Sequence, residues 1–484
     1  MSGRDASRRA ERGHRERPVA HAPDPRPRLD RDAAVRSSSL RVGRRPAVGA
    51  AVLFAHRAAG ARREGRDHQP RGAALPVARA RHRGERVSFD VIVVGAGPAG
   101  AATAILLAER GLRILVLDRA RFPRPKICGE YLSPETLRVL DRLGVLKAVD
   151  HAGATPLAGM RITAPDGTAV TGTYRAIGAW RPYRDHALAL GREVLDAILV
   201  DRVRALGVEL RERTRVTDVL VDDGHVVGVE AMDADTRVHV FRAPLVVAAD
   251  GRASVVARRL GLLREHRLQR MALVTYVRGV SECGEVGEIF IDPPDYAILN
   301  PIAPDRINMS VVVPLADAAA WSHRLEDFFT ARVGQLAHLA RRVAGAERTA
   351  PVQAMGPLAY DVAAPTVGGL LLVGDAAGFY DPLTGEGVFS ALRGAELASD
   401  VAAAALQAGD CSAKRLGSYQ RARRRVFAAK ARFTHALQFV VARRRLANLT
   451  ARVLVRRPGL LDLLLGVVGD YVPPGRLLHP ARRR

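Results

Sequence analysis

The chain has 484 residues, of which 48% are hydrophobic, and it contains only three cysteines. This length allows two or three domains with a large buried core, and no apolar run reaches the ~18 residues of a membrane-spanning helix. Three widely spaced cysteines provide neither a disulfide framework nor a Cys-x-x-Cys metal site, and they favour a reducing cytoplasm. We therefore expect a cytoplasmic protein without a bound metal.

The formal net charge of +25 is concentrated at the two ends of the chain. Residues 1–86 contain 22 Arg and nine acidic residues, whereas residues 411–484 contain 18 basic and two acidic residues. The residues between these segments have a net charge of −4. A nucleic-acid enzyme normally places positive charge along its working groove, so this distribution argues against a nucleic-acid partner.

Residues 1–86 are rich in Arg, Ala and Pro and show no sustained helix or strand periodicity. Such a segment buries too little apolar surface to offset the entropy lost on ordering. We therefore predict a disordered tail over residues 1–86.

The first regular pattern, "FDVIVVGAGPAGAATAILLAERGLRILVLDR", predicts a strand, a glycine-rich turn, a helix and a second strand. Gly95, Gly97 and Gly100 form G-x-G-x-x-G between the first strand and the helix. Gly95 permits the tight turn, Gly97 lets the backbone approach a pyrophosphate, and Gly100 lets helix and strand pack closely. Asp118 ends the second strand, where a carboxylate can accept hydrogen bonds from a ribose. The unit predicts dinucleotide binding.

Further elements follow in order along the chain. Ser133 and Pro134 are typical of a helix start, and residues 191–207 predict another helix. Alternating strands then meet at a hairpin turn over Asp223–Gly224. Residues 265–350 alternate strands with helix, and a last strand, "GGLLLVGDAAG", precedes a basic helical C-terminus.

Three further segments resemble motifs of the para-hydroxybenzoate hydroxylase superfamily of flavoprotein monooxygenases. "LVVAADGRASVVARRLG" is similar to its Asp-Gly motif, "LLLVGDAAGFYDPLTGEG" to its Gly-Asp motif, and "LGREVLDAIL" to its Arg-x-x-Leu-Asp helix. Taken alone, Asp250 and Asp375 could simply cap helices, but four motifs in the family's order favour a flavin site. The resemblance covers roughly residues 87–410 and implies FAD as the cofactor. Because the sequence has no second G-x-G-x-x-G, NAD(P)H is expected to bind only transiently or to be replaced by another electron carrier.

The resemblance also implies a role for individual residues. Asp375 would bind the ribityl chain, Pro382 would border the isoalloxazine ring, and Arg192 would face the diphosphate. Backbone N–H groups around Gly385 to Val388 would stabilise negative charge on the reduced ring. The cofactor-binding residues predicted from motif and resemblance are Gly95, Gly97, Pro98, Ala99, Gly100, Asp118, Arg119, Arg192, Asp250, Gly251, Gly374, Asp375, Pro382, Gly385, Gly387 and Val388.

Within the superfamily, "PLTGEG" and "PKICGEYLSP" resemble the geranylgeranyl reductase branch, in which a cysteine lies near the flavin. The resemblance places Cys128 at the reactive face of the ring. Two roles remain open for this residue: a catalytic thiol, which needs a lowered pKa, or a small side chain that packs.

The stretch "YAILNP" departs from the Tyr-x-Trp-x-Phe-Pro segment of isoprenoid reductases, because Ile298 and Asn300 replace the two aromatic residues. The departure favours a different or more polar ligand. Tyr296 is retained, either as a hydrogen-bond or proton donor or as a wall residue. Related halogenases carry Trp-x-Trp-x-Ile-Pro, and the absence of both tryptophans argues against halogenation. The candidate catalytic residues are Cys128 and Tyr296.

We predict an α/β protein with a Rossmann-type, glutathione reductase-like FAD-binding domain, an inserted mixed β-sheet substrate domain and a helical C-terminus. The FAD-binding domain is assigned to residues 87–160, 185–262 and 355–405, the substrate domain to 161–184 and 263–354, and the basic helical region to 406–484. That last region alternates basic and apolar residues at helical spacing, so it either lies on an anionic membrane or packs on the FAD domain.

Three functions are compatible with these patterns. The first is an NAD(P)H-driven reductase that acts on a carbon–carbon double bond of an apolar, isoprenoid-like small molecule. The second is an FAD-dependent monooxygenase that hydroxylates an aromatic or polyketide-type secondary metabolite. The third is a basic membrane- or nucleic-acid-binding protein whose flavin fold is inert.

Overall fold

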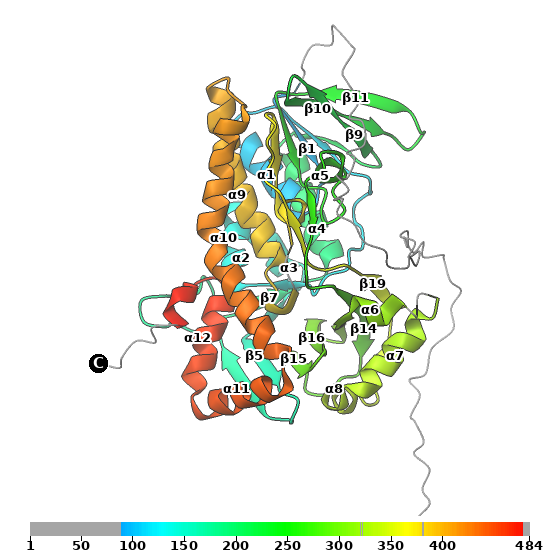
Figure 1. Ribbon diagram of the computed structural model, residues 1–484, viewed down its shortest axis with the longest axis vertical. Helices are drawn as coiled ribbons and strands as arrows, with labels where there is room; N and C mark the ends of the chain where they lie inside the picture. Colours follow the sequence, from blue (N-terminus) through cyan, green and yellow to red (C-terminus); the bar gives the residue numbers. More distant parts are fainter. Residues whose placement is uncertain (1–88, 320, 322, 380–381, 478–484) are drawn as a thin grey trace, which may run out of the picture. The chain divides into compact units, whose positions relative to one another are not determined.

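The computed structural model describes residues 89–319, 321, 323–379 and 382–477 (Figure 1). The predicted disordered tail over residues 1–86 lies outside this range. None of the helices in the described range is long and apolar enough to cross a membrane.

A five-stranded parallel sheet forms the centre of the predicted FAD-binding domain, in the order β21–β12–β1–β2–β8. Four of its strands are entirely apolar and buried, as is typical of a parallel sheet covered on both faces, whereas the edge strand β8 reads Glu-Leu-Arg. Val91 and Val93 pack on the side of α1, α4 and α9, whereas Ile92 and Val94 pack on the side of a three-stranded sheet, β9–β10–β11. The elements are β1 (Val91–Val94), α1 (Pro98–Ala108), β2 (Ile114–Leu117), α4 (Arg192–Ala205), β8 (Glu209–Arg211), β9 (Arg215–Asp222), β10 (His225–Met232), β11 (Val238–Arg242), β12 (Leu245–Ala248), β21 (Leu370–Leu372) and α9 (Gly387–Gln407).

The predicted substrate domain contains an eight-stranded, mostly antiparallel sheet, here called the substrate sheet, in the order β18–β14–β17–β16–β15–β5–β6, with β19 also paired to β14. Its strands fall within residues 159–173 and 270–355, whereas β13 (Leu263–Glu265) pairs with β20 (Tyr360–Val362) in a separate two-stranded sheet. The strands are β5 (Gly159–Thr163), β6 (Ala169–Thr173), β14 (Arg270–Arg278), β15 (Val286–Asp292), β16 (Asp295–Ala303), β17 (Arg306–Pro314), β18 (Glu347–Arg348) and β19 (Gln353–Met355).

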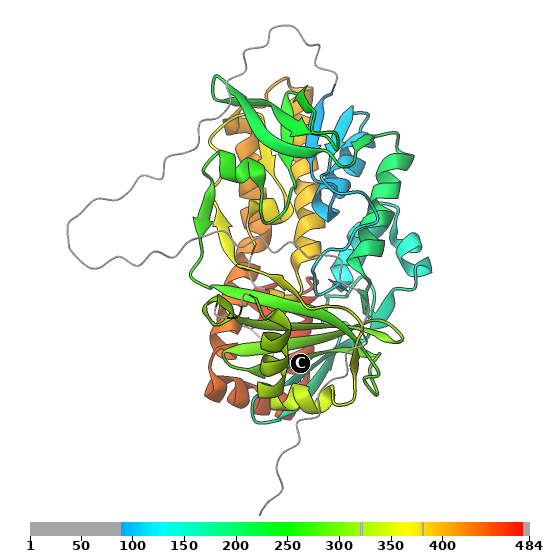
Figure 2. The same cartoon turned by 90° about the vertical axis from the view of Figure 1, so that its right-hand side faces the viewer.

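The two faces of the substrate sheet follow the alternation of side chains along each strand. On β14, for example, Leu273 belongs to a core shared with three helices, and Val274 belongs to a core shared with the C-terminal helices. In Figure 1 the strands lie between these two groups of helices, and Figure 2 views them from the side of the first group. The three helices are α6 (Leu315–Ala319), α7 (Leu325–Gln335) and α8 (Ala337–Arg342).

The C-terminal region is helical, as predicted. Helix α10 packs along α9, and α11 and α12 pack on β6 (Figure 1). A Cβ at Gly172 of β6 would lie 2.6 Å from Leu461, so glycine permits the close approach of α12. The helices are α10 (Ala413–Val441), α11 (Arg444–Arg456), α12 (Pro458–Val468) and the 3-10 helix η3 (Pro474–Leu477).

The remaining elements connect these parts. They are β3 (Tyr131–Leu132), α2 (Pro134–Arg142), α3 (Leu146–His151), β4 (Thr155–Leu157), β7 (Ala187–Ala189), α5 (Val255–Arg259), β13 (Leu263–Glu265), β20 (Tyr360–Val362) and the 3-10 helices η1 (Gly374–Ala377) and η2 (Pro382–Thr384). The predicted α/β class, with its inserted mixed sheet and helical C-terminus, is confirmed.

Candidate functional site

The glycine-rich turn between β1 and α1 is shaped by steric necessity. Gly95 has φ +95°, and a Cβ there would lie 2.6 Å from the carbonyl oxygen of Ala249. A Cβ at Gly100 would lie 1.8 Å from the carbonyl oxygen of Gly95. At Gly97 the nearest atom is Arg124 Nη2, 3.7 Å away, so this position is open toward the cavity described below. Gly95 and Gly100 are needed by the fold, and the space beside Gly97 is available to a ligand.

Asp118 is held next to this turn by two backbone donors. Its Oδ2 accepts a hydrogen bond from the N–H of Ala96 at 2.7 Å, and its Oδ1 accepts one from the N–H of Ala120 at 2.7 Å. The side chain is 8% exposed and lines the cavity. The carboxylate is therefore fixed at the end of β2, where the motif predicts a ribose contact.

The second half of the predicted FAD site approaches the first through another glycine. Gly374 has φ +62°, and a Cβ there would lie 2.7 Å from the Cβ of Ala99. This contact brings η1, which carries Asp375, against the N-terminus of α1. Gly387 and Val388 begin α9 and line the cavity, and no side chain caps this helix N-terminus. Two helix N-termini thus open on the same space, an arrangement suited to negative charge.

One cavity of about 510 Å³ collects most of the predicted residues. Gly100 and Gly374 act in packing and lie outside its lining, as does Tyr296. The predicted residues that line it are Gly95, Gly97, Pro98, Ala99, Asp118, Arg119, Cys128, Arg192, Asp250, Gly251, Asp375, Pro382, Gly385, Gly387 and Val388.

The charged side chains of the cavity fit a dinucleotide with a diphosphate. Arg124, Lys126, Arg192 and Arg252 all line it. Burial lowers the pKa of Lys126. Burial also raises the pKa of Asp375, whereas the positive charges of Lys126 and Arg252 act to lower it. Several partly desolvated cations around an open glycine turn are the groups that a diphosphate requires.

Arg192 is oriented within the cavity wall by its own helix. Its Nε and Nη2 each donate a 2.8 Å hydrogen bond to the carboxylate of Asp196, one helical turn later, and Arg124 forms an ion pair with the same carboxylate at 3.2 Å. Burial lowers the pKa of Arg192, but Asp196 and the neighbouring Cys128 more than offset this effect and leave the pKa raised. The guanidinium group is therefore a fixed charge beside the thiol.

The turn that carries Cys128 is held by a pair of asparagines from the substrate sheet. Asn300 on β16 and Asn308 on β17 are cross-strand partners. Asn300 Nδ2 donates to the carbonyl oxygens of Gly129 and Glu130, at 2.8 and 3.2 Å. Asn308 Nδ2 donates to the carbonyl oxygen of Cys128 at 2.8 Å. Three consecutive carbonyl groups are thus bound to two neighbouring interior strands of the substrate sheet, β16 and β17.

Glu130 is a cavity residue that the sequence patterns did not single out. Its Oε1 accepts hydrogen bonds from the N–H of Arg192 at 2.9 Å and from Tyr276 Oη at 3.0 Å, and its Oε2 accepts one from Asn308 Nδ2 at 3.0 Å. Burial raises the pKa of its carboxyl group, although these hydrogen bonds oppose the change. Its place two residues after Cys128, in "CGE", is the signal that could have directed attention to it.

Tyr296 is fully buried and does not reach the cavity. The guanidinium of Arg270 lies over its ring, 5.5 Å from the ring centre. Of the two predicted catalytic residues, the structure therefore places Cys128 in the cavity wall and Tyr296 outside the lining, in the core on the same face of the sheet as Ile298.

The rest of the cavity wall is apolar and comes from two directions. The substrate sheet contributes one set of side chains, and the C-terminal helices contribute the other. Those of the sheet include Met160, Ile162, Ala272, Val274, Ile289, Ile291, Ile298 and Val312; those of α10 and α12 are Phe433, Leu437, Val441, Leu461, Leu464, Leu465 and Val468.

Comparison with known proteins agrees with this geometry. Residues 88–434 match the FAD binding domain family. Digeranylgeranylglycerophospholipid reductase 1 of Methanothermobacter thermautotrophicus is 30% identical over 351 residues, which cover 69% of this chain and 81% of the relative. The chain belongs to this FAD-binding family, within its geranylgeranyl reductase branch. It is an FAD-dependent oxidoreductase.

Two other proteins are similar to this chain, one in sequence and one in fold. Conditioned medium factor receptor 1 of Dictyostelium discoideum is 29% identical, over 69% of this chain and 66% of that protein. The solved structure of the flavin-dependent brominase Bmp2 shares the fold with a TM-score of 0.69 and 22% identity, over 81% of this chain and 98% of that one. The predicted recognition of the superfamily is confirmed.

In this flavoprotein the C-terminal helices are tied to the flavin loop by a buried lysine. Lys430 Nζ of α10 donates to Asp470 Oδ1 at 2.6 Å and to the carbonyl oxygens of Val467 and Val468 at 2.6 and 3.2 Å. It also forms a 3.4 Å ion pair with Glu386, directly before α9. The α10 wall of the cavity is thereby attached to the loop predicted to border the flavin.

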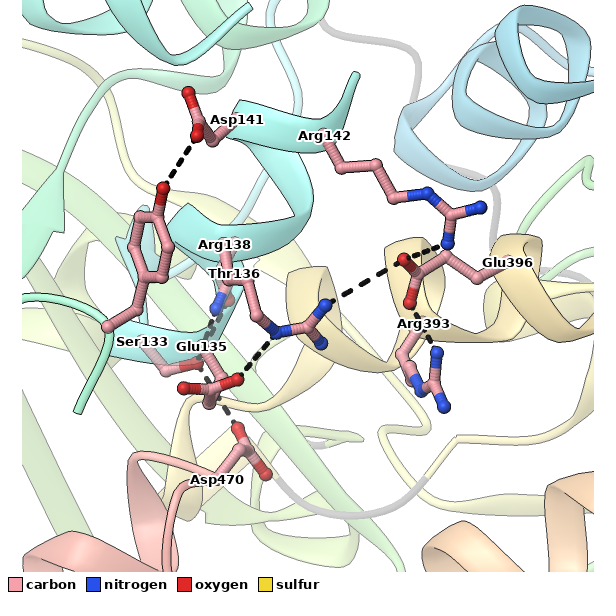
Figure 3. Close-up of polar contacts among 10 residues, drawn as sticks. Ser133, Glu135, Thr136, Arg138, Asp141, Arg142, Arg393, Glu396 and Asp470 are labelled. Atoms are coloured by element: carbon pink, nitrogen blue, oxygen red, sulfur yellow. Dashed lines mark hydrogen bonds and ion pairs between the residues drawn. The ribbon is translucent and has the colours of Figure 1, made fainter. Parts of the chain in front are cut away.

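A second polar cluster continues from Asp470 to α2 and α9 (Figure 3). Ser133 caps α2 and donates to Asp470 Oδ2 at 3.2 Å. On α9 the buried Glu396 accepts hydrogen bonds from Arg142 and Arg393, at 2.7 and 2.6 Å. These contacts join α2 to the middle of α9 and to Asp470, which follows α12.

Proposed function

We propose that this oxidoreductase uses NAD(P)H and FAD to reduce a carbon–carbon double bond of an apolar, isoprenoid-like molecule. The observation that carries the proposal is the apolar wall, which shares one cavity with the FAD-binding residues. A pocket lined by the substrate sheet and by α10 and α12 suits an extended hydrocarbon. The reductase names of the relatives support the same assignment.

In this reaction bound FAD supplies the hydride, and the protein binds and orients the substrate. Side chains such as Ile298 and Phe433 exclude water from the site. Glu130 lines the cavity, and burial raises the pKa of its carboxyl group, so it is suited to hold the proton that the second carbon of the double bond needs. Arg192 and the helix N-termini stabilise negative charge.

The test is oxidation of NADH and NADPH by the FAD-loaded full chain, with and without geranylgeraniol or a geranylgeranyl phospholipid, under nitrogen and in air. The proposal predicts substrate-dependent oxidation under nitrogen and a product heavier by two hydrogens. Oxidation that requires oxygen and yields a product heavier by one oxygen atom would contradict it.

Hydroxylation is the second candidate function. Two polar side chains in the cavity wall, Asn300 and Ser310, favour a substrate more polar than a hydrocarbon. The oxygen arm of the same experiment decides between the two functions.

We further propose that the enzyme is cytoplasmic and rests on an anionic membrane surface through α11. Leu449 and Val453 are exposed on this helix, and Arg445 and Arg456 lie at helical spacing from them on the same side. Apolar side chains among basic ones are typical of helices that lie in a membrane interface.

The test is sedimentation with vesicles that contain 30% phosphatidylserine. Substitution of both Leu449 and Val453 by Ser should lower the bound fraction several-fold, whereas Val238→Ser, at a site 60% exposed on β11, should not. Equal binding of both variants would contradict the proposal.

A further inference from the structure

The apolar part of the cavity begins at the loop predicted to border the flavin and follows α10. Lys430 of α10 is paired with Glu386, and the two residues after Glu386 line the cavity. From this point on, the cavity-lining residues of α10 follow one another at intervals of about one helical turn. They are Phe433, Leu437 and Val441. This row lies on one side of the helix and leads away from the flavin loop.

Helix α12 provides a second row of apolar side chains that starts at the same place. The carbonyl oxygens of Val467 and Val468, at the end of α12, accept hydrogen bonds from Lys430 Nζ. The cavity-lining side chains of Val468, Leu464 and Leu461 lead back along α12 from this contact. We call the part of the cavity between these two rows and the substrate sheet the apolar groove.

The exposure of the side chains falls along both rows with distance from Lys430. On α10, Phe433 and Leu437 are half-buried, whereas Val441 is only 5% exposed. On α12 the first two residues of the row are half-buried, and Leu461 is fully buried. The apolar groove therefore narrows toward Val441 and Leu461.

An ion pair lies just past this narrow end. Arg444 of α11, three residues after Val441, is paired with Asp292, which directly follows the cavity residue Ile291 on β15. Neither Arg444 nor Asp292 lines the cavity. The helical wall is thus joined to the substrate sheet just past Val441, and the apolar groove ends there.

Helix geometry gives the length of the apolar groove. Val441 is eight residues after Phe433, and eight residues of α-helix span about 12 Å. An extended carbon chain advances about 1.3 Å per bond, because bonds of about 1.5 Å alternate in direction. A length of about 12 Å therefore holds about ten carbons of a straight chain, or about two isoprene units.

We propose that the apolar groove selects the substrate by length: it holds a chain end of about two isoprene units, with Val441 and Leu461 as its floor. The double bond that is reduced then lies just outside the groove, beside the flavin loop. In farnesol this is the double bond next to the hydroxyl group, and in geranylgeraniol it is the next one along the chain. The choice of an isoprenoid rests on the proposed function, in which one hydride and one proton saturate the double bond.

The experiment measures the binding of straight-chain 1-alkanols with six to fourteen carbons to the FAD-loaded full chain. Displacement of the fluorescent probe 1-anilinonaphthalene-8-sulfonate reports binding without NAD(P)H, so no turnover is needed. Each added carbon should strengthen binding about fourfold, because one more CH₂ group leaves water. This gain should fall below about 1.5-fold per carbon once the chain exceeds about ten carbons and the groove is full.

Two substitutions at the floor should move this break in opposite directions. Val441→Ala lengthens the apolar groove and should move the break up by one or two carbons, whereas Val441→Phe shortens it and should move the break down. Val426→Ala makes the first change at a site on α10 that is 38% exposed, so it should leave the break in place. Melting temperatures report the folding of the variants, and the alkanol series with the unaltered chain depends on none of them.

The outcomes separate the inference from the proposed function. Affinity that still rises about fourfold per carbon at fourteen carbons, or no binding of any alkanol, would overturn the inference. A break that both Val441 variants leave in place would also overturn it. A break near ten carbons without any reduction of alkenes would support the apolar groove and overturn the reductase. Where alkenes are reduced, loss of the terminal double bond of farnesol before the one next to its hydroxyl group would overturn the inference alone.

Discussion

Lys430 is the one buried lysine of α10 whose loss should be felt both in stability and at the flavin loop. Replacement by Met keeps much of the volume but removes the charge from between Asp470 and Glu386. Burial lowers the pKa of Lys430, but the two carboxylates raise it further, so the lysine is charged in the folded protein. Its removal leaves two carboxylates and two backbone carbonyl groups without their donor.

Breaking a buried ion pair by removing one partner costs about 3–5 kcal/mol. We expect a loss of this size in the free energy of unfolding, measured in urea with saturating FAD. The matched control is Lys414→Met, an exposed lysine on the same helix, which should change stability by less than about 0.5 kcal/mol. A change below about 1 kcal/mol for Lys430→Met, or one equal to that of the control, would refute the reasoning.

Two other changes test the cofactor site and the buried acid. Gly97→Val should weaken FAD binding at least about 10-fold in a fluorescence titration with little loss of stability, because its side chain enters the cavity, whereas Gly100→Ala should destabilise the fold itself. Equal effects of both on stability would contradict the distinction. Glu130→Gln tests the raised pKa of the Glu130 carboxyl group. Above about pH 4.5 this group ionises in the unfolded chain before it ionises in the folded protein. The unaltered apoprotein should therefore lose stability relative to the variant as the pH rises, until the folded carboxyl group ionises too. A difference in unfolding free energy that stays constant from pH 4 to 8 would argue against a raised pKa.

The cofactor half of the site could be predicted because its determinants are local. The turn at Gly95, the acid at Asp118 and the loop at Asp375 each follow a strand, and parallel strands end at one edge of their sheet. The resemblance to a family supplied the identity of the cofactor. The helical C-terminus was also predictable, because its apolar residues recur at helical spacing.

The substrate half could not be predicted in the same way, since it depends on contacts between distant segments. Asn300 and Asn308 bind a turn 170 and 180 residues earlier in the chain, and Lys430 meets Asp470 forty residues later. The replacement of an aromatic residue by Asn300 suggested a more polar ligand, but the structure shows that half of that amide serves the protein itself. Tyr296 matched a motif, and only the packing shows that it is fully buried and does not line the cavity.

The central claim is that one cavity holds FAD against an apolar alkene. The most direct measurement is a single turnover: the enzyme-bound flavin is reduced with one equivalent of dithionite under nitrogen and then mixed with geranylgeraniol. The account predicts that the oxidised flavin spectrum returns without oxygen and that one equivalent of alkene is reduced. Flavin that stays reduced until air is admitted, with the alkene unchanged, would contradict it.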